Sequence, residues 1–257
     1  MTPQEKYIAF KTIVRKEVVR FCRIWPQTLL PPVITQTLYF VIFGKFVGSR
    51  IGLVQGIDYM AFIVPGLVMM AVINSAFSNV VSSFFGSKFQ RNIEELMVSA
   101  TPDWVIISGF SVGGILRGIL VGIIVFGVSV FFTHPQGYNI WIIALFVILT
   151  SMIFALAGLL NGVLAKKFDD VSIFQTFGLT PLIYLGGVFY SIHNLPEFWQ
   201  NLSRLNPILY MIDGFRYGFY GVSDVNILIS ILILIIFVIV LTWVNLDLFK
   251  KGTGLRN

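Results

Sequence analysis

The residues of this chain that could take part in chemistry are few and far apart. The single cysteine, Cys22, and the two histidines, His134 and His193, are widely separated, so they predict neither a disulfide nor a metal site. No G-x-x-x-x-G-K-[ST], H-E-x-x-H or G-x-S-x-G motif is present. We therefore expect no catalytic residues, no metal and no cofactor in this chain, which by itself is not predicted to be an enzyme.

A group of polar residues interrupts one strongly apolar segment. Asn74 and Ser78 are four residues apart and would share one face of a helix, with further amides and hydroxyls beside them. We define the polar face as Asn74, Ser75, Ser78, Asn79, Ser82 and Ser83. Unpaired amides facing lipid are costly, so this face is predicted to point into a helical bundle or a cavity. It would either line a transport path or only hydrogen-bond to neighbouring helices.

An acidic pair lies in a short segment between two apolar stretches, residues 88–100. Glu94 and Glu95 stand beside apolar residues with helical spacing, and Pro102 would end the helix. The apolar patch consists of Ile93, Leu96 and Met97. A short amphipathic helix of this kind can dock on a soluble partner. The alternative is a solvated helix that touches only lipid headgroups.

These residues must be positioned by helices that cross a membrane. The chain is 56% hydrophobic and only 12% charged, with a mean hydropathy of +0.86, whereas soluble domains carry about 25% charged residues. A length of about 20 residues per crossing divides it into six predicted spans of an all-α membrane protein. The predicted spans are Thr28–Val47, Tyr59–Phe85, Trp104–Phe132, Ile140–Leu164, Val171–Tyr190 and Ile227–Phe249.

The basic residues predict how these spans are oriented. Most of the 18 Lys and Arg residues lie before span 1, between spans 2 and 3, between spans 4 and 5, and after span 6. By the positive-inside rule, these regions and both termini are predicted to be cytoplasmic. The net charge of +6 therefore indicates membrane topology and not nucleic-acid binding. The first 25 residues lack the apolar core of a secretory signal peptide, so we expect span 1 to be retained.

The N-terminal residues 5–25 alternate apolar and basic side chains with helical spacing. This pattern predicts an amphipathic helix that lies in the cytoplasmic membrane interface and ends at Pro26. The alternative is an ordinary helix packed on another subunit.

The segment 191–221 is too apolar for a water-exposed loop and too interrupted for a regular span. Asn206 followed by Pro207 is a favourable helix start. We therefore predict two half-helices, 196–205 and 207–220, that form a re-entrant hairpin at the outer side of the membrane. The alternative is a hairpin that lies on the membrane surface.

Span 3 combines a ladder of small residues with one deeply placed charge. Gly114, Gly118 and Gly122 are each four residues apart, a spacing that lets two helix backbones approach closely. Arg117 lies near the middle of the same helix, so we expect a carbonyl, a side chain or a water to satisfy it. Its role, structural or substrate-binding, stays open from the sequence.

Three stretches of the chain resemble the permease subunits of ABC-2-type exporters of bacterial inner membranes. They are residues 23–44, residues 89–102 (FQRNIEELMVSATP) and residues 168–218. The six-span layout agrees with them, and the resemblance covers nearly the whole chain. It implies a single ABC-2-type transmembrane domain over 1–257, with the fold of the type V ABC exporters.

The resemblance also implies partners. Two copies of this chain would form a homodimer in the lipid bilayer and bind two copies of a separate P-loop ABC ATPase, which would hold ATP and Mg²⁺. Residues 88–100 would be the coupling helix that seats in a groove of the ATPase, with the turn 166–170 as a second contact. The residues assigned to ATPase coupling are Glu94, Glu95, Leu96, Met97, Lys167, Asp169 and Asp170.

The resemblance further implies a path between the two copies, lined by spans 2 and 5 and capped by the hairpin. The predicted path residues are Phe62, Met69, Met70, Asn74, Ser78, Phe174, Phe177 and Tyr184. The predicted gate residues are Pro196, Phe198, Trp199, Asn206 and Pro207. Aromatic and Met-rich walls would suit export of a lipid, a glycan or an amphiphilic small molecule, although such residues also serve for plain packing.

Other functions are compatible with six spans. One is a carrier driven by an ion gradient, and another is a membrane assembly or scaffold protein. A proton-driven carrier usually needs a titratable residue inside the bundle. From the sequence only Arg117 lies there, and arginine does not titrate in proteins. An intramembrane enzyme is disfavoured because no nucleophile and base are visible together.

Overall fold

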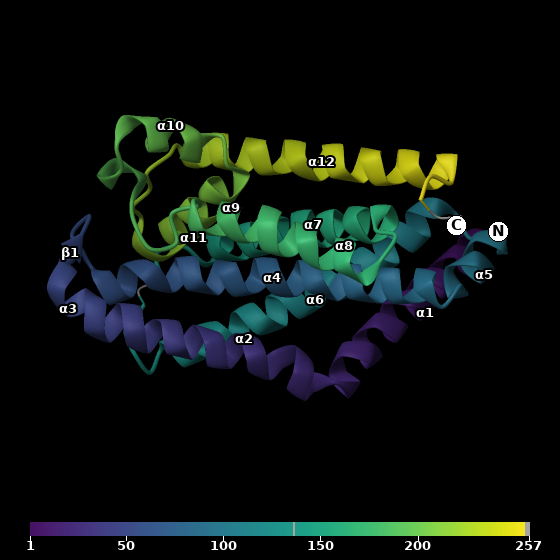
Figure 1. The fold of residues 1–257 in the computed structure, drawn as a ribbon, viewed down its shortest axis with the longest axis horizontal. Helices are drawn as coiled ribbons and strands as arrows, with labels where there is room; N and C mark the ends of the chain where they lie inside the picture. Colours follow the sequence, from purple (N-terminus) through teal and green to yellow (C-terminus); the bar gives the residue numbers. More distant parts are fainter. Residues whose placement is uncertain (136, 255–257) are drawn as a thin grey trace.

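The computed structural model describes residues 1–135 and 137–254, whose helices form an elongated bundle (Figure 1). Both termini lie at the same end of the bundle, beside α5 (Asn92–Val98), and we call this the terminal end. The opposite, distal end carries β1 (Leu53–Val54) and α10 (Glu197–Arg204). Among the described residues, five helices are long and apolar enough to cross a membrane. They are Trp25–Ile51, Tyr59–Phe89, Asp103–Ser129, Ile140–Leu164 and Ile227–Lys251.

The N-terminal fifth of the chain, up to Ile51, is a bent pair of helices. Its elements are α1 (Pro3–Arg23), α2 (Trp25–Tyr39), the π-helical η1 (Phe40–Val47) and α3 (Gly48–Ile51). Thr2 and Glu5 form a capping box that starts α1. The helix predicted over residues 5–25 ends at Arg23, close to the predicted boundary, and Pro26 lies in the first turn of α2, where a proline is favourable.

The helix α4 (Tyr59–Phe89) is the centre of the bundle. It follows the two-residue antiparallel pair of β1 with β2 (Ile57–Asp58), and the Asp58 carboxylate accepts the Met60 N–H at 3.1 Å to start it. Its most apolar window is 89% buried. A helix that is apolar on every side needs neighbours on every side, and α4 packs against α2, α6 (Asp103–Ser129), α7 (Ile140–Leu164) and α11 (Pro207–Tyr220).

Glycines allow α6 and α7 to approach α4 closely. A Cβ atom at Gly114 would lie 2.4 Å from Val80 Cγ2, and one at Gly122 would lie 2.7 Å from Val72 Cγ2. On α7, a Cβ atom at Gly158 would lie 2.6 Å from the carbonyl oxygen of Phe77. The packing role predicted for the glycine ladder is therefore confirmed.

The fifth predicted span, Val171–Tyr190, differs from a regular helix. It consists of α8 (Phe168–Ile173), the π-helical η2 (Phe174–Leu179) and α9 (Thr180–Tyr184). The helix stops before Gly186, and Gly187 has a φ of +77°, a left-handed conformation that favours glycine. Inside the run, Thr180 Oγ1 donates to the Gln175 carbonyl at 3.0 Å. The resulting helix is shorter than the about 20 residues of a straight crossing.

The two predicted half-helices are present as α10 and α11, after the short 3₁₀ turn η3 (Ile192–Asn194). Most of α11 is buried, whereas α10 is largely exposed at the distal end (Figure 1). The last helix, α12 (Ile227–Lys251), has a window with mean hydropathy 3.3, of which only 11% is buried. An apolar helix with so little protein around it is typical of contact with lipid.

The close contact of α7 with α4 predicts that alanine destabilises the protein at Gly158 but not at Gly127, which lies outside that contact. Gly158→Ala should lower stability by about 1–3 kcal/mol, because the new methyl group meets backbone that cannot move away. Gly127→Ala on α6 meets nothing within 4 Å and should be neutral or stabilising by about 0.5–1 kcal/mol through helix propensity. Thermal unfolding of the detergent-purified variants measures both, and equal shifts would contradict the packing described.

Candidate functional site

The predicted coupling helix is α5, and it is shorter than the predicted 88–100. Lys88 and Phe89 belong to α4, and Arg91, with a φ of +62°, forms the turn before Asn92. Ile93 is buried in the apolar cluster of the terminal end, against which Leu96 and Met97 are also partly packed. Glu94 and Glu95 point away from the bundle, together with Val98, which is 89% exposed. The outer surface of α5 is therefore acidic. It also exposes the apolar side chain of Val98, which the sequence analysis did not single out.

Lys88 is not the exposed loop cation that the topology argument assumed. Its Nζ donates to the carbonyl oxygens of Val163 at 2.8 Å and Ala165 at 2.6 Å, and the residue is 5% exposed. A cation at the last carbonyls of a helix is favourable, because those groups lack helical partners and carry partial negative charge. Lys88 thus ties the end of α4 to the end of α7.

The turn between α7 and α8 lies at the same end of the bundle. The Asp170 carboxylate accepts the backbone N–H of Lys166 at 2.8 Å and of Lys167 at 3.0 Å, and these bonds hold the pKa of Asp170 below its usual value. Lys167 and Asp169 are exposed. Phe168 packs edge-on against Phe85 of α4 at 4.9 Å. The structure therefore places this turn beside the C-terminal end of α4. The Asp170 carboxylate stabilises the turn through its two backbone hydrogen bonds.

The polar face of α4 makes hydrogen bonds to other segments. Ser78 accepts from Gln175 Nε2 at 3.1 Å, which joins α4 to η2. Asn79 Oδ1 accepts from Arg20 of α1 at 2.8 Å. Ser83 Oγ donates to Glu17 at 2.6 Å. The interhelical role left open by the sequence is confirmed for these members of the face.

Asn74 differs from the rest of the polar face. It is half-buried, and its Nδ2 donates to the Met70 carbonyl of its own helix at 2.9 Å. The Ser75 hydroxyl is buried and has no hydrogen-bond partner among the residues that the structure describes. Within the polar face, Ser82 is exposed and Asn74 and Ser78 are half-buried, so these three are the members that another molecule could reach.

The predicted path residues do not share one surface of the chain. Phe62 and Met69 are fully buried, and Met70 is 8% exposed. Phe177 is 76% exposed, and Phe174 and Tyr184 are also exposed. Phe62 and Met69 therefore serve packing in this conformation, because α4 is surrounded on all sides, and the side chains of η2 and α9 are the ones that face outward.

Aromatic side chains, of which Tyr184 is exposed and the others half-buried, gather where α9 meets α2. The Tyr184 and Tyr39 hydroxyls lie 2.9 Å apart, and the Phe189 ring stacks on Tyr184 with centroids 5.9 Å apart. Phe43 lies 4.6 Å from the Phe189 ring. This aromatic group lies in the distal half of the bundle and includes Tyr184, one of the predicted path residues.

A buried ion pair on α11 was missed by the sequence argument. Asp213 and Arg216 are each 1% exposed, and their charged groups lie 3.8 Å apart. The Arg216 guanidinium lies 3.9 Å above the Phe62 ring and donates to the Gly187 carbonyl at 2.7 Å. The expectation that Arg117 is the only ionisable residue inside the bundle is therefore wrong. The signal was an Asp and an Arg three residues apart within an apolar helix.

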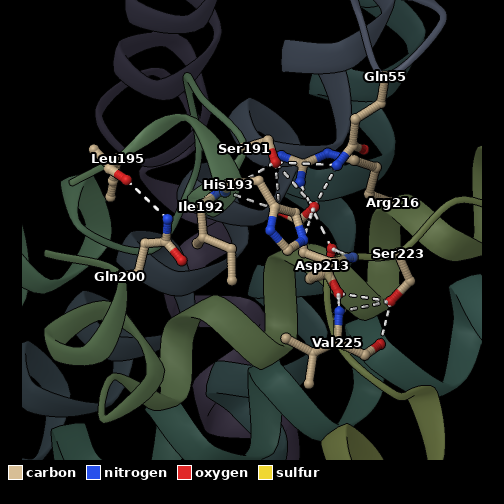
Figure 2. A network of polar contacts seen from close by, with 11 residues as sticks. Gln55, Ser191, Ile192, His193, Leu195, Gln200, Asp213, Arg216, Ser223 and Val225 are labelled. Carbon is tan, nitrogen blue, oxygen red and sulfur yellow. Dashed lines mark hydrogen bonds and ion pairs between the residues drawn. The ribbon is translucent and has the colours of Figure 1, made fainter. Parts of the chain in front are cut away.

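Asp213 is the centre of a polar network at the distal end (Figure 2). It accepts the Ser223 hydroxyl at 2.7 Å and the backbone N–H groups of Asp224 at 2.9 Å and Val225 at 3.0 Å. Asp224 accepts in turn from Ser191 Oγ at 2.9 Å. Across residues 1–135 and 137–254, no three His, Cys, Asp or Glu side chains gather as a metal site.

The distal network joins segments far apart in the sequence. Asp224 also accepts from the Ile192 N–H at 3.1 Å and from the side chain of Gln55, and His193 Nε2 lies 3.6 Å from it. Gln55 belongs to the turn of the β1–β2 pair. The network therefore fastens this turn, the 185–195 segment and the loop before α12 to α11.

The predicted gate residues divide into an anchored and an exposed group. Asn206 is 3% exposed, its Oδ1 accepts the Ile208 N–H at 3.0 Å, and its Nδ2 donates to the Leu182 carbonyl at 2.6 Å. It therefore starts α11 as predicted and also holds α9. Pro207 is half-buried behind it. Pro196, Phe198 and Trp199 of the α10 region are exposed.

Arg117 has a backbone carbonyl as its partner, which is one of the three kinds of partner that the sequence analysis predicted. Its guanidinium donates to the Thr28 carbonyl at 3.2 Å, and the residue is 9% exposed. The Thr28 carbonyl lies in the first turns of α2, so Arg117 holds α6 to α2. This contact shows the structural one of the two roles that the sequence left open for Arg117.

The buried pair on α11 predicts a test by single and double substitution. Asp213→Ala should cost about 3–5 kcal/mol, because it leaves the Arg216 charge buried without its partner. Replacing both residues, Asp213→Leu with Arg216→Met, should cost less, since no buried charge remains. Thermal unfolding in detergent distinguishes the two, and a double variant as unstable as the single one would show that the network, not the charge pair, dominates.

Comparisons with known proteins show which family the chain resembles. A family model described as ABC-2 type transporter matches residues 8–220. The chain is 56% identical over 251 residues to the inner membrane transport permease YadH of Escherichia coli K12, covering 98% of both chains. It is 24% identical over 219 residues to nodulation protein J of Rhizobium leguminosarum bv. viciae, covering 83% of both chains.

The matched region begins in α1, includes α5 and the turn 166–170, and ends with α11. It thus contains the exposed acidic helix at the terminal end, the central α4 and the helices of the distal end. The match covers most of the chain, and the similarity to the permease extends over nearly its full length. The chain belongs to the ABC-2 type transporter family.

Proposed function

We propose that this chain is the membrane-spanning subunit of an ATP-driven exporter, and that a separate P-loop ATPase supplies the energy. The observation that carries the proposal is α5. In a chain of the ABC-2 type transporter family, this helix holds Glu94 and Glu95 outward while Ile93 anchors it in the bundle. An acidic helix fixed to the base of the central helix can pass the movement of a docked partner into the membrane domain.

The proposed topology has six crossings, with the run from α8 to α9 as the fifth. The distribution of Lys and Arg supports cytoplasmic termini, and both termini lie at the terminal end (Figure 1). A relative 56% identical over nearly the full length carries the name of an inner membrane transport permease, which supports the inner membrane as the location of this chain. In this orientation the distal network lies on the outer side.

The contacts along α4 suggest how movement would reach the far side. At the terminal end, Lys88 ties α4 to α7, and Phe168 packs on Phe85. At the distal end, Phe62 supports Arg216, which belongs to α11. A displacement of α5 would therefore move α4, and α4 would move α11 through a buried contact. Because α11 also carries the distal network, the outer cap of the chain would shift with it.

The exported molecule would pass between two copies of this chain. The surface we assign to the path combines the half-buried Asn74 and Ser78 of the polar face with the exposed side chains of Phe174, Phe177 and Tyr184. Such a surface combines amide groups with aromatic rings and suits a lipid, a glycan or an amphiphilic small molecule. The exposed aromatic residues of α10, Phe198 and Trp199, would lie over the exit.

The buried Asp213 bears on the alternative of a proton-driven carrier, which needs a titratable group inside the bundle. Asp213 is buried, but it is paired with Arg216 and accepts one hydroxyl and two backbone N–H groups. A carboxylate so fully satisfied favours a structural role over proton transfer. The exporter therefore remains the function that the site supports best.

The coupling assignment predicts that Glu94→Arg abolishes ATPase recruitment, because it reverses a charge on the docking surface while α5 stays anchored by Ile93. Glu197→Arg makes the same change on α10 at the other end of the bundle and should leave recruitment intact. A tagged pull-down from solubilised membranes, with ATP hydrolysis assayed on the eluate, measures both. Undiminished recruitment by Glu94→Arg would remove the coupling role from this residue.

A further inference from the structure

A groove lined by basic and hydroxyl side chains lies along α1 at the terminal end, and we call it the basic groove. One part, about 520 Å³, runs along α1, and the other, about 240 Å³, lies between α1 and the end of α4. Its basic residues are Arg15, Lys16, Arg20 and Arg23. Its second wall includes Ser82, Ser83, Ser87 and Asn92.

The groove carries an excess of positive charge. The carboxylate beside it, Glu17, is fully buried, lies 3.2 Å from Arg20 and accepts the Ser83 hydroxyl at 2.6 Å. Glu17 is therefore already paired with one of the four cations. Arg15, Lys16 and Arg23 are exposed. Lys16 and Arg23 lie four and three residues from Arg20, on the same side of the helix. One carboxylate beside four cations leaves the groove with a net positive charge that a bound anion would balance.

Lys16 is held at the mouth of the groove. Its Nζ lies 3.4 Å from Ser87 Oγ and 5.4 Å from the centre of the Phe110 ring. Ser87 is 8% exposed, so its hydroxyl is sheltered from solvent. An ammonium group beside hydroxyl donors is a favourable setting for phosphate oxygens, and guanidinium groups such as those of Arg15 and Arg23 bind them in the same way.

The surroundings of the groove indicate that the anion carries an apolar part. Val19 is 45%, Ile24 37% and Trp25 52% exposed, next to the basic residues. Basic and apolar side chains together on an exposed helix are typical of a helix at a membrane surface that attracts anionic lipids. We infer that the basic groove is a binding site for the phosphate group of an anionic membrane amphiphile.

This inference rests on the proposed function in one respect only, the position of α1 at the membrane surface. It needs no ATPase. Within the exporter, Arg20 and Ser83 connect the groove to the polar face of α4. A phosphate group bound there would lie at the inner start of the proposed path.

Gly86 provides a way to test the groove without disturbing the fold. It lines the part between α1 and α4, and a Cβ atom placed on it meets nothing within 4 Å. A side chain at this position would enter the open groove. Gly86→Glu would bring a negative charge among the cations, and Gly86→Gln would bring a group of nearly the same size without the charge.

The experiment is native mass spectrometry of the full-length chain, purified in detergent and incubated with phosphatidylglycerol or with zwitterionic phosphatidylcholine. We expect the wild type and Gly86→Gln to retain phosphatidylglycerol. Gly86→Glu should bind it about tenfold more weakly, as should Lys16→Gln combined with Arg23→Gln. The combined variant leaves the Glu17–Arg20 pair in place and serves if Gly86→Glu fails to fold.

Competition with inorganic phosphate distinguishes the two sources of the anion. Displacement of phosphatidylglycerol by inorganic phosphate would support recognition of the phosphate group alone, and resistance would support recognition of the whole lipid headgroup. Equal retention by all variants, or equal retention of phosphatidylcholine, would overturn the inference. If the variants bind phosphatidylglycerol as expected but the wild-type chain recruits no ATPase in the pull-down, only the exporter proposal is overturned.

Discussion

The structure depends on the burial of α4 on all sides by α2, α6, α7 and α11. Lipid chains are as apolar as leucine, so apolar contact alone does not drive one helix onto another. Close approach must do so, and the missing Cβ atoms of Gly114 and Gly158 allow it. They bring α6 and α7 against the side chains and carbonyl oxygens of α4. Every candidate site of the molecule is positioned by reference to this central helix.

Each end of α4 is secured by a desolvated cation. Lys88 binds the last carbonyl oxygens of α7 at the terminal end, and Arg216 lies on the Phe62 ring at the distal end. Burying these charges is favourable only because carbonyl oxygens, a carboxylate or an aromatic face meet them. In the proposed exporter, these two contacts would let α4 connect the docking helix α5 to the distal end, as coupled transport requires.

The terminal end combines two surfaces of opposite charge. The outward face of α5 is acidic, and the basic groove beside α1 is cationic. In our proposals, the acidic surface would bind the ATPase and the basic groove would bind a phosphate-bearing amphiphile. Both surfaces adjoin the base of α4, so events at either are positioned to act on the same helix.

Hydropathy and turn chemistry in the sequence by themselves determined the helical membrane class, the long apolar helices, the glycine packing ladder and the two half-helices begun by Asn206–Pro207. These follow from local composition and spacing. Tertiary structure alone decided that Ile93 anchors α5 while Val98 faces outward, that Phe62 and Met69 are buried, and that Asp213 pairs with Arg216. Such outcomes depend on which segments meet in space. A charge can be buried only where distant backbone groups, such as the Gly187 and Val163 carbonyls, arrive to satisfy it.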